Sequence, residues 1–112
     1  MQPGTMSSMG KDSGQNEVKK AIIKKCEQVS QTLKSLSHPV RLKVMCHLIE
    51  GERSVSELTD FCEITQSAMS QFLNRMKSEG IVMSRREGTN VYYKMGDQNL
   101  IKLLRAIKEI YC

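Results

Sequence analysis

Apolar side chains recur at helical spacing within residues 65–80. They fall at positions i, i+3, i+4 and i+7, the spacing of one buried helix face, and are Met69, Phe72, Leu73 and Met76. The opposite face carries short uncharged side chains that donate and accept hydrogen bonds, namely Ser67, Ser70, Gln71 and Asn74. Ser and Asn lower helix stability, so a face that meets only water is normally filled with Glu, Lys and Arg. The pattern therefore favours a helix that reads base edges in the DNA major groove over one whose neutral face is merely solvated.

A shorter apolar period precedes this helix. Ser54 is a helix-capping residue and Glu57 stands three positions later, which is the capping-box pattern at a helix start. The helix is expected over residues 54–62, with inward positions at Val55, Leu58 and either Phe61 or Cys62. Only residues 63–65 join the two helices, so the connection must be a tight turn. Two helices joined in this way form a helix-turn-helix.

The apolar period changes from 3.6 to 2 after Gly80, in residues 81–86 and again in residues 91–95. Residues 87–90 contain a glycine and an asparagine, so they are expected to be the turn of a β-hairpin. A hairpin after a recognition helix is a wing, whose basic side chains Arg85, Arg86 and Lys94 can bind phosphates or enter the minor groove. Residues 66–94 hold five basic side chains against two acidic ones, which gives this segment a positive charge.

Three further apolar stripes predict helices over residues 17–36, 38–51 and 97–112. Their inward positions are Val18, Ile22, Cys26, Val29, Leu33 and Leu36 in the first, Leu42, Met45, Cys46, Leu48 and Ile49 in the second, and Leu100, Leu103, Leu104, Ile107, Ile110 and Tyr111 in the last. A helix-turn-helix with a wing is too small to cover the first and last stripes, so a monomer would expose apolar area. We expect a homodimer through these two helices, with two recognition helices about 34 Å apart on an inverted repeat of double-stranded DNA.

The composition agrees with one small DNA-binding domain. The 112 residues are 39% hydrophobic, enough for a small core, and the formal net charge of +5 favours an anionic partner. Residues 1–16 are rich in Gly, Ser, Gln and Met without an apolar period, so we expect a disordered tail before a DNA-binding and dimerisation domain over 17–112. The tail lacks the layout of a secretion signal and no apolar run could span a membrane, so a cytoplasmic protein is expected.

Four segments together resemble the ArsR/SmtB family of dimeric winged-helix regulators. They are residues 36–42 (Leu-Ser-His-Pro-Val-Arg-Leu), 54–58, 66–73 and 86–93. The resemblance covers residues 33–112 and implies a mainly α (α+β) winged helix-turn-helix, with four helices, a β-hairpin and a fifth helix. It implies a regulator, usually a repressor that leaves DNA when an inducer binds, and not an enzyme. With the polar helix face and the wing, it gives the expected DNA-binding residues Gln66, Ser67, Ser70, Gln71, Asn74, Arg75, Lys77, Arg85, Arg86 and Asn90.

The family resemblance implies no metal site. Some metal-sensing relatives carry a Cys-x-Cys pair in the helix before the turn, where this chain has Thr59, Asp60 and Phe61. Others pair Asp and His on the last helix, and here no histidine follows Asp97. Neither ligand set is present, so no metal ion or cofactor is expected.

Two cysteines resemble those of one branch of the family, which includes HlyU, BigR and SqrR. Cys46 stands in Val-Met-Cys-His-Leu and Cys112 in Glu-Ile-Tyr-Cys. In that branch the matching cysteines form a dithiol, and its closure to a disulfide or polysulfide link releases DNA. The resemblance therefore implies that Cys46 and Cys112 sense an oxidant or a reactive sulfur species.

Several alternatives remain open. Cys46 could be a packed core cysteine, as Cys26 and Cys62 are expected to be, and Cys26 could instead complete an arsenite site with Cys112. A thiol oxidoreductase is disfavoured because the sequence has no Cys-x-x-Cys. A winged-helix module that binds protein would not need the neutral polar face or the arginine pair. The sequence does not distinguish a repressor from an activator that displaces a silencer.

Overall fold

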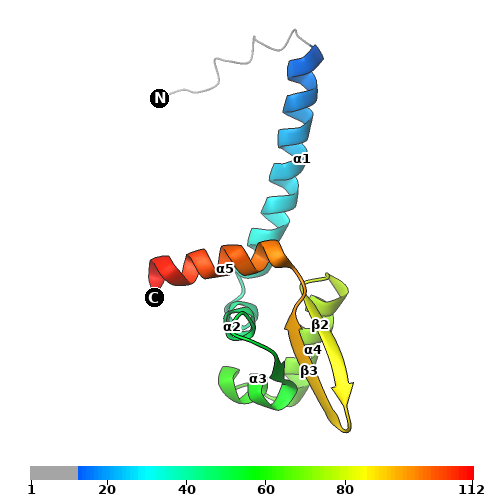
Figure 1. Cartoon of the computed structure of the whole chain (residues 1–112), viewed down its shortest axis with the longest axis vertical. Helices are drawn as coiled ribbons and strands as arrows, with labels where there is room; N and C mark the ends of the chain where they lie inside the picture. The colour runs from blue at the N-terminus through cyan, green and yellow to red at the C-terminus, as the bar shows by residue number, and fades with distance from the viewer. Residues whose placement is uncertain (1–12) are drawn as a thin grey trace. The chain divides into compact units, whose positions relative to one another are not determined.

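The computed structural model describes residues 13–112, which form five helices and three strands (Figure 1). In chain order these are α1 (Ser13–Leu36), α2 (Pro39–Leu48), β1 (Arg53–Ser54), α3 (Val55–Cys62), α4 (Gln66–Ser78), β2 (Val82–Glu87), β3 (Asn90–Met95) and α5 (Gln98–Tyr111). This is the predicted winged helix-turn-helix, with the short strand β1 added. The chain divides into two compact units, one containing α1 and the other formed by residues 37–112.

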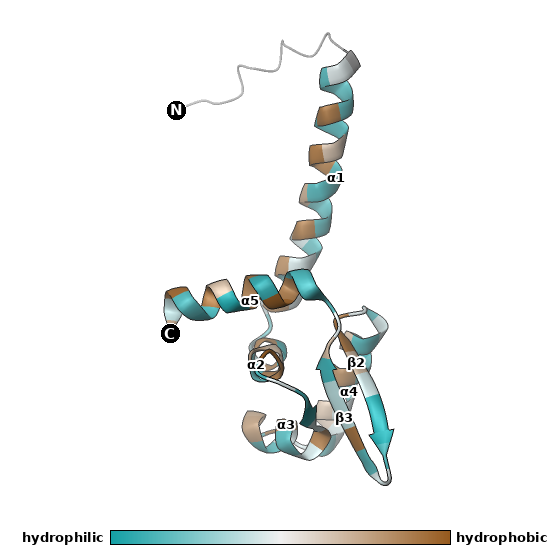
Figure 2. Ribbon diagram, in the orientation of Figure 1, coloured by the Kyte–Doolittle hydropathy of each residue, from teal (hydrophilic) through white to brown (hydrophobic). Residues whose placement is uncertain are grey.

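Helix α1 begins at Ser13, ahead of the expected start at Glu17. The rest of the predicted tail, residues 1–12, lies outside the described residues. Apolar residues recur along the helix (Figure 2). The side chains of Val18, Ile22 and Val29 are each more than half exposed, so a continuous apolar stripe faces solvent.

The starts of α2 and α5 follow from their capping residues. Pro39 occupies the first turn of α2, and the Nδ1 atom of His38 accepts a hydrogen bond from the Val40 amide at 3.2 Å. At α5 the side chain of Asp97 accepts hydrogen bonds from the amides of the second and third helical residues, at 3.0 and 3.1 Å. His38 and Asp97 are the first residues of the ranges expected for these two helices.

The core of residues 37–112 lies between the helices and the inner face of the sheet. Its buried apolar residues are Val44, Met45, Leu48, Leu58, Cys62, Met69, Leu73, Met76, Ile81, Val82, Tyr93, Met95, Leu100 and Leu104. The inward stripe predicted for α4 is confirmed at three of its four positions, and the fourth, Phe72, is half-buried with its ring 4.9 Å from that of His38.

The prediction was less accurate for α2. Val44 of α2 is fully buried although it was left out of the predicted stripe, because α2 packs against α3, β3 and α5 and has no single inward face. In α3 the structure decides between the two expected alternatives, since Leu58 and Cys62 are buried while Phe61 is half exposed. At the end of α5, Ile110 and Tyr111 are exposed in the single chain, as expected for a stripe that the domain alone cannot cover.

The sheet is antiparallel in the order β1-β3-β2. Strand β2 pairs with β3 so that Arg85 lies opposite Tyr92 and Arg86 opposite Val91. Gly88, at φ +64°, lies in the two-residue turn between these strands, where a positive φ favours glycine. Residues directly opposite each other share a face of the sheet and successive residues alternate. The inner face therefore carries Tyr93, and the outer face carries Tyr92.

Candidate nucleic-acid interface

The turn between α3 and α4 sets the direction of α4. Glu63 takes the left-handed conformation at φ 54° and ends α3. The side chain of Thr65 then accepts a hydrogen bond from the Ala68 amide at 3.1 Å and caps α4. Because the apolar stripe of α4 is turned inward, all seven of its predicted DNA-binding residues are exposed: Gln66, Ser67, Ser70, Gln71, Asn74, Arg75 and Lys77.

A polar groove lies between α4, the start of α3 and the wing. It is lined by Ser54, Val55, Ser56, Gln66, Ser70, Leu73, Asn74, Thr89, Asn90, Val91 and Tyr93. The groove brings together four predicted site residues, three from α4 and Asn90 from the wing. Ser67, Gln71, Arg75 and Lys77 are exposed on α4 but do not line it. The sequence prediction did not include Ser54, Ser56 and Thr89, although the first belongs to the capping box and the last to the recognised turn.

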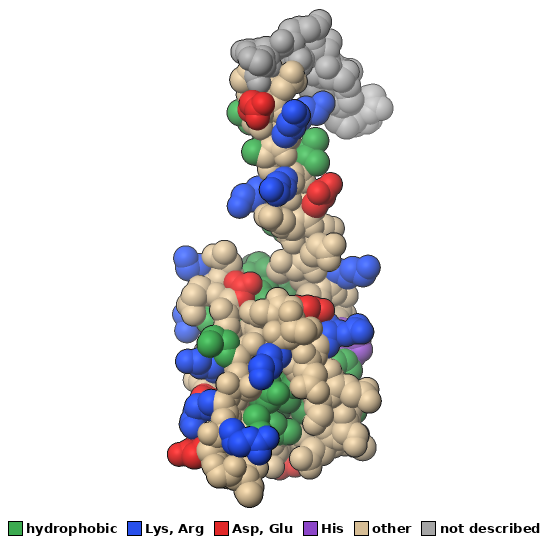
Figure 3. All heavy atoms as spheres, turned by 90° about the vertical axis from the view of Figure 1, so that its right-hand side faces the viewer, with side chains coloured by type: hydrophobic (Ala, Val, Ile, Leu, Met, Phe, Trp, Pro, Cys, Tyr) green, Lys and Arg blue, Asp and Glu red, His purple; other side chains and the backbone are tan. Residues whose placement is uncertain are grey.

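The two adjacent arginines of the wing have different surroundings. Arg85 makes hydrogen bonds with Glu52 and Glu87, and its guanidinium carbon lies 4.6 Å from the centre of the Tyr92 ring. Arg86 lies opposite Val91, which lines the groove, so these two residues share a face. Figure 3, which looks onto the side of the wing, shows Lys and Arg side chains distributed among acidic ones.

An ion pair joins the start of α2 to the end of α4. The Nη2 atom of Arg41 lies 2.5 Å from Oε1 of Glu79, the residue that ends α4. The Arg41 side chain is 10% exposed and that of Glu79 is 43% exposed. A largely buried guanidinium requires such a partner, so this contact helps fix the position of α4 relative to α2.

The predicted redox cysteines lie in one cluster between α2 and α5. Cys46 of α2 is half-buried, Cys112 follows α5 and is exposed, and both are free thiols. Burial raises the pKa of the Cys46 thiol, the charge of Cys112 raises this pKa further, and Lys108 opposes both. Helix α2 contacts α5, and a hydrogen bond joins Lys108, four residues before Cys112, to Glu50, four residues after Cys46. Glu50, which the sequence prediction did not include, also belongs to the cluster through its hydrogen bond with Lys108.

The other two cysteines are on other helices, Cys62 on α3 and Cys26 on α1. Cys62 is buried and its pKa is raised by that burial, in agreement with a packing residue. Cys26 is exposed on α1, which forms the other compact unit.

His47, beside Cys46, connects α2 to its neighbours. Its ring stacks on that of Phe61 with centroids 4.1 Å apart and planes inclined by 6°. Its Nε2 atom accepts a hydrogen bond from Nε of Arg53 at 3.2 Å, which links α2 to β1. The half-exposed Phe61 therefore contacts α2 through this stacked pair.

Residues 13–112 contain neither a metal-binding cluster nor a membrane-spanning helix. In this part of the chain no three His, Cys, Asp or Glu side chains are grouped so that they could hold a metal ion. None of its helices combines the length and apolar character needed to cross a membrane.

Comparison with known proteins gives matches over most of the chain. Residues 38–84 match the family described as bacterial regulatory protein, arsR family. The biofilm growth-associated repressor of Xylella fastidiosa strain 9a5c is 35% identical over 107 residues, which cover 96% of this chain and 94% of the relative. The crystal structure of the Xylella fastidiosa repressor BigR superimposes with a TM-score of 0.77, at 37% identity, over 84% of this chain and 96% of that one.

Two further solved structures have the same fold. Reduced HlyU from Vibrio cholerae matches with a TM-score of 0.78 and 29% identity, over 82% of this chain and 97% of that one. A homodimeric winged helix-turn-helix DNA-binding domain from Mycobacterium bovis matches with a TM-score of 0.66 and 25% identity, over 91% and 88% of the two chains. The chain thus belongs to the arsR family of bacterial transcriptional regulators, in the branch that contains HlyU and BigR.

Proposed function

We propose that this regulator binds an inverted-repeat operator as a homodimer and releases it when Cys46 and Cys112 become linked through sulfur. The observation that carries the proposal is the contact between α2 and α5, where the Lys108–Glu50 hydrogen bond lies four residues from Cys112 on one helix and four residues from Cys46 on the other chain segment. The cluster lies between α2 and α5, in the same compact unit as α4 and the wing. A bond between the two cysteines would constrain α5 relative to α2, and α2 holds the end of α4 through Arg41.

The DNA-reading part of the proposal rests on the groove beside α4. The neutral side chains of Gln66, Ser70 and Asn74 are exposed along one side of the helix, and Asn90 faces the same groove from the wing. Amides and hydroxyls of this kind can pair with donors and acceptors on base edges. Arg75 and Lys77 at the end of α4 are exposed cations that suit phosphates.

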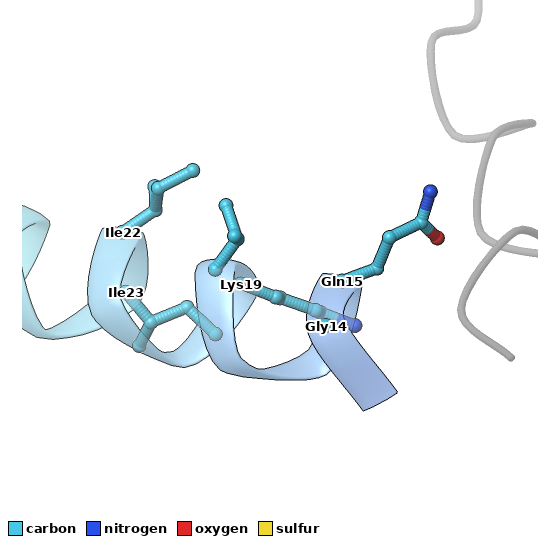
Figure 4. Close-up of a pocket in the computed structure, with 6 residues that line it drawn as sticks. Gly14, Gln15, Lys19, Ile22 and Ile23 are labelled. Carbon is cyan, nitrogen blue, oxygen red and sulfur yellow. The ribbon is translucent and has the colours of Figure 1, made fainter. Parts of the chain in front are cut away.

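The dimer is supported by the apolar stripe of α1 and by the end of α5. On α1 a shallow hollow is lined by Gly14, Gln15, Val18, Lys19, Ile22 and Ile23, and its isoleucine side chains point away from the helix (Figure 4). At the end of α5, Ile110 is 72% exposed and Tyr111 is 81% exposed. A second copy of the chain would bury these side chains, and the Mycobacterium bovis domain described above is itself homodimeric.

The chemistry of the switch follows from the different exposure of the two thiols. Cys112 is exposed, so its thiolate attacks the outer sulfur of a low-molecular-weight persulfide, RS–SH, and RS⁻ leaves. The Cys46 thiolate then attacks the inner sulfur of the resulting Cys112 persulfide, and HS⁻ leaves. Two protein thiols are oxidised to a disulfide while the persulfide is reduced to RSH and H₂S. If a second RS–SH first converts Cys46 to a persulfide and releases RS⁻, the Cys46 persulfide then attacks the inner sulfur of the Cys112 persulfide. This attack gives a link of three sulfur atoms, and HS⁻ leaves.

The proposal can be tested by measuring DNA affinity in reduced and treated protein. Operator duplexes are first selected from fragments of the source genome, and binding is followed by fluorescence anisotropy. Treatment of the wild type with a persulfide donor should lower its affinity, and a thiol reductant should restore it. Cys46→Ser and Cys112→Ser should bind DNA as the reduced wild type does but should not respond to the donor.

Cys26→Ser and Cys62→Ser serve as matched controls and should respond as the wild type does. If release persists in both Cys46→Ser and Cys112→Ser, the dithiol is not the switch. Release by arsenite that requires Cys26 and Cys112 would identify the alternative inducer. A chain that binds no selected duplex at any salt concentration would contradict the proposed DNA interface itself.

A further inference from the structure

We propose that the neighbouring arginines of the wing have separate tasks, with Arg85 holding the wing in position through Glu52 and Arg86 binding a DNA phosphate. The inference rests on the proposed DNA interface and assigns roles within it. Sequence alone treats the two residues alike, as adjacent cations on one strand. Their environments in the folded chain differ in both geometry and charge.

Arg85 is held from several sides by the protein itself. Its Nε and Nη2 atoms donate to the two carboxylate oxygens of Glu52 at 2.9 and 2.8 Å, and its Nη1 atom donates to Glu87 at 3.2 Å. Planar two-point pairing of this kind is the strong and directional form of the Arg–carboxylate contact. The guanidinium also lies over the ring of Tyr92.

The contact between Arg85 and Glu52 crosses the sheet. The strand order is β1-β3-β2, Glu52 immediately precedes β1, and Arg85 is on β2. The bridge therefore spans the middle strand and covers Tyr92, the residue of β3 that lies opposite Arg85. An isolated two-stranded hairpin has marginal stability, so a clamp to a third strand limits how far the wing can swing.

The positive charge of Arg85 is already paired with carboxylates of the protein itself. Two carboxylates surround its guanidinium, and the pKa of Glu52 is held below its usual value chiefly by the hydrogen bond from Arg85. Glu52 therefore stays ionised in neutral solution. A phosphate that approached Arg85 would have to displace these carboxylates and would be repelled by them.

Arg86 has the position that a phosphate ligand needs. It follows Arg85 on the strand, so its side chain points to the opposite face. That face includes Val91 and Tyr93, which line the groove beside α4. Arg86 is exposed near the turn of the wing, where a DNA backbone could reach it.

The test is the salt dependence of operator binding for matched variants of each arginine. Loss of one phosphate contact reduces the slope of log affinity against log salt by about one per bound subunit. Arg86→Gln should reduce the slope in this way, and Arg86→Lys should retain it. Arg85→Gln and Arg85→Lys should both weaken operator binding by about two- to fivefold, as expected for loss of an exposed ion pair, with the wild-type slope.

Glu52→Gln provides the second half of the test. Glu52→Gln should weaken operator binding as much as Arg85→Gln does. The variant with both substitutions should bind the operator as tightly as either single variant, because each substitution removes the same contact. In the free protein, amide hydrogen exchange in β2 and β3 should be faster in both single variants and in the double variant than in the wild type. Lys102→Gln, at an exposed position of α5, serves as the charge control and should change neither the slope nor the exchange.

Three results would overturn the inference while leaving the DNA interface in place. One is a reduced slope in Arg85→Gln that Arg85→Lys restores, because Arg85 would then be a phosphate ligand. Another is tighter binding by Glu52→Gln, because Glu52 would then compete with DNA for Arg85. The third is wild-type affinity in every Arg85 and Glu52 variant. A wild-type chain that binds no duplex would instead remove the proposed function, and this inference with it.

Discussion

Lys108 of α5 donates a hydrogen bond to Glu50, which follows α2, with Nζ and Oε2 2.5 Å apart. Cys46 lies four positions before Glu50, and Cys112 lies four positions after Lys108. The ion pair therefore connects the chain segments that carry the two thiols. Glu50 also lies 3.8 Å from Arg53, which donates to His47, so the pair belongs to a polar network that reaches β1.

Removing either member of this ion pair should change the reactivity of Cys46 in opposite directions. Burial raises the pKa of Cys46 most, the charge of Cys112 raises it next, Lys108 lowers it and Glu50 raises it. Glu50→Gln should therefore lower this pKa and speed alkylation at pH 8, while Lys108→Gln should raise the pKa and slow the reaction. The rate is measured by mass spectrometry of the peptide that contains Cys46. Changes of the same sign in both variants would contradict the electrostatic explanation.

The stability of the chain should fall in acid because of three carboxylates. A hydrogen bond is the largest cause of a lowered pKa in each of them. The pKa of Glu50 is lowered by its hydrogen bond with Lys108, and the pKa of Glu52 by its hydrogen bond with Arg85. The pKa of Glu57 is lowered by a hydrogen bond from the backbone amide of Ser54. A lowered folded-state pKa gives stability that is fully present above the ordinary value of 4.5 and is lost as pH falls through the lower folded value. The free energy of unfolding in urea should therefore decline below about pH 4.5. Glu57→Gln should flatten this decline, and an unchanged slope in that variant would contradict the assignment.

The cap of α4 should contribute to the stability of the folded chain. The Thr65 side chain accepts a hydrogen bond from the Ala68 amide. Thr65→Ala removes this acceptor and leaves the amide without its side-chain partner. The free energy of unfolding should fall by about 1 kcal/mol in urea titrations, within the range typical of lost N-caps. Ser67→Ala, in the first turn and fully outside the cap, is the control and should not destabilise the helix. Equal stability of the two variants would argue against a capping role for Thr65.

The sequence predicted most of the elements, because their signals are local. The apolar spacing of α4, the capping box of α3 and the alternation of β2 and β3 each lie within one segment. The short strand β1 was missed because Arg53 and Ser54 are too few to show a period. Val44 was missed because α2 is enclosed on several sides, so its buried residues do not follow a single stripe.

The contacts of the site depend on residues distant in sequence. No local pattern distinguishes Arg85 from Arg86, since the partner that separates them, Glu52, is 33 positions away. The pairing of Cys46 with Cys112 was implied by family resemblance and not by spacing, because it requires α5 to cross α2. The α1 stripe was visible in the sequence, and its exposure in the folded chain supports the proposed dimer.

Base reading by α4 predicts a sequence-specific loss. Gln71→Ala should weaken operator binding by about 1 to 3 kcal/mol if the amide pairs with a base, while binding to random DNA stays the same. Lys77→Gln is the matched control, because loss of a phosphate contact should weaken binding to operator and random duplexes alike. Both affinities are measured by competition titration at fixed salt. An equal effect of Gln71→Ala on both duplexes would remove this residue from base reading.

Dimerisation through α1 predicts that one charge on its apolar stripe separates the subunits. Ile22 is 57% exposed in the single chain, and Ile22→Asp would place a carboxylate in the proposed interface, where it would be desolvated. Sedimentation at micromolar concentration should give a dimer for the wild type and a monomer for the variant. Lys24→Asp is the control, because it introduces the same aspartate on the opposite side of α1. This variant should remain dimeric. An inverted repeat needs two recognition helices, so the monomeric variant should also lose its preference for the full operator over a half-site. If the Ile22→Asp protein is still a dimer, this face of α1 is not the interface.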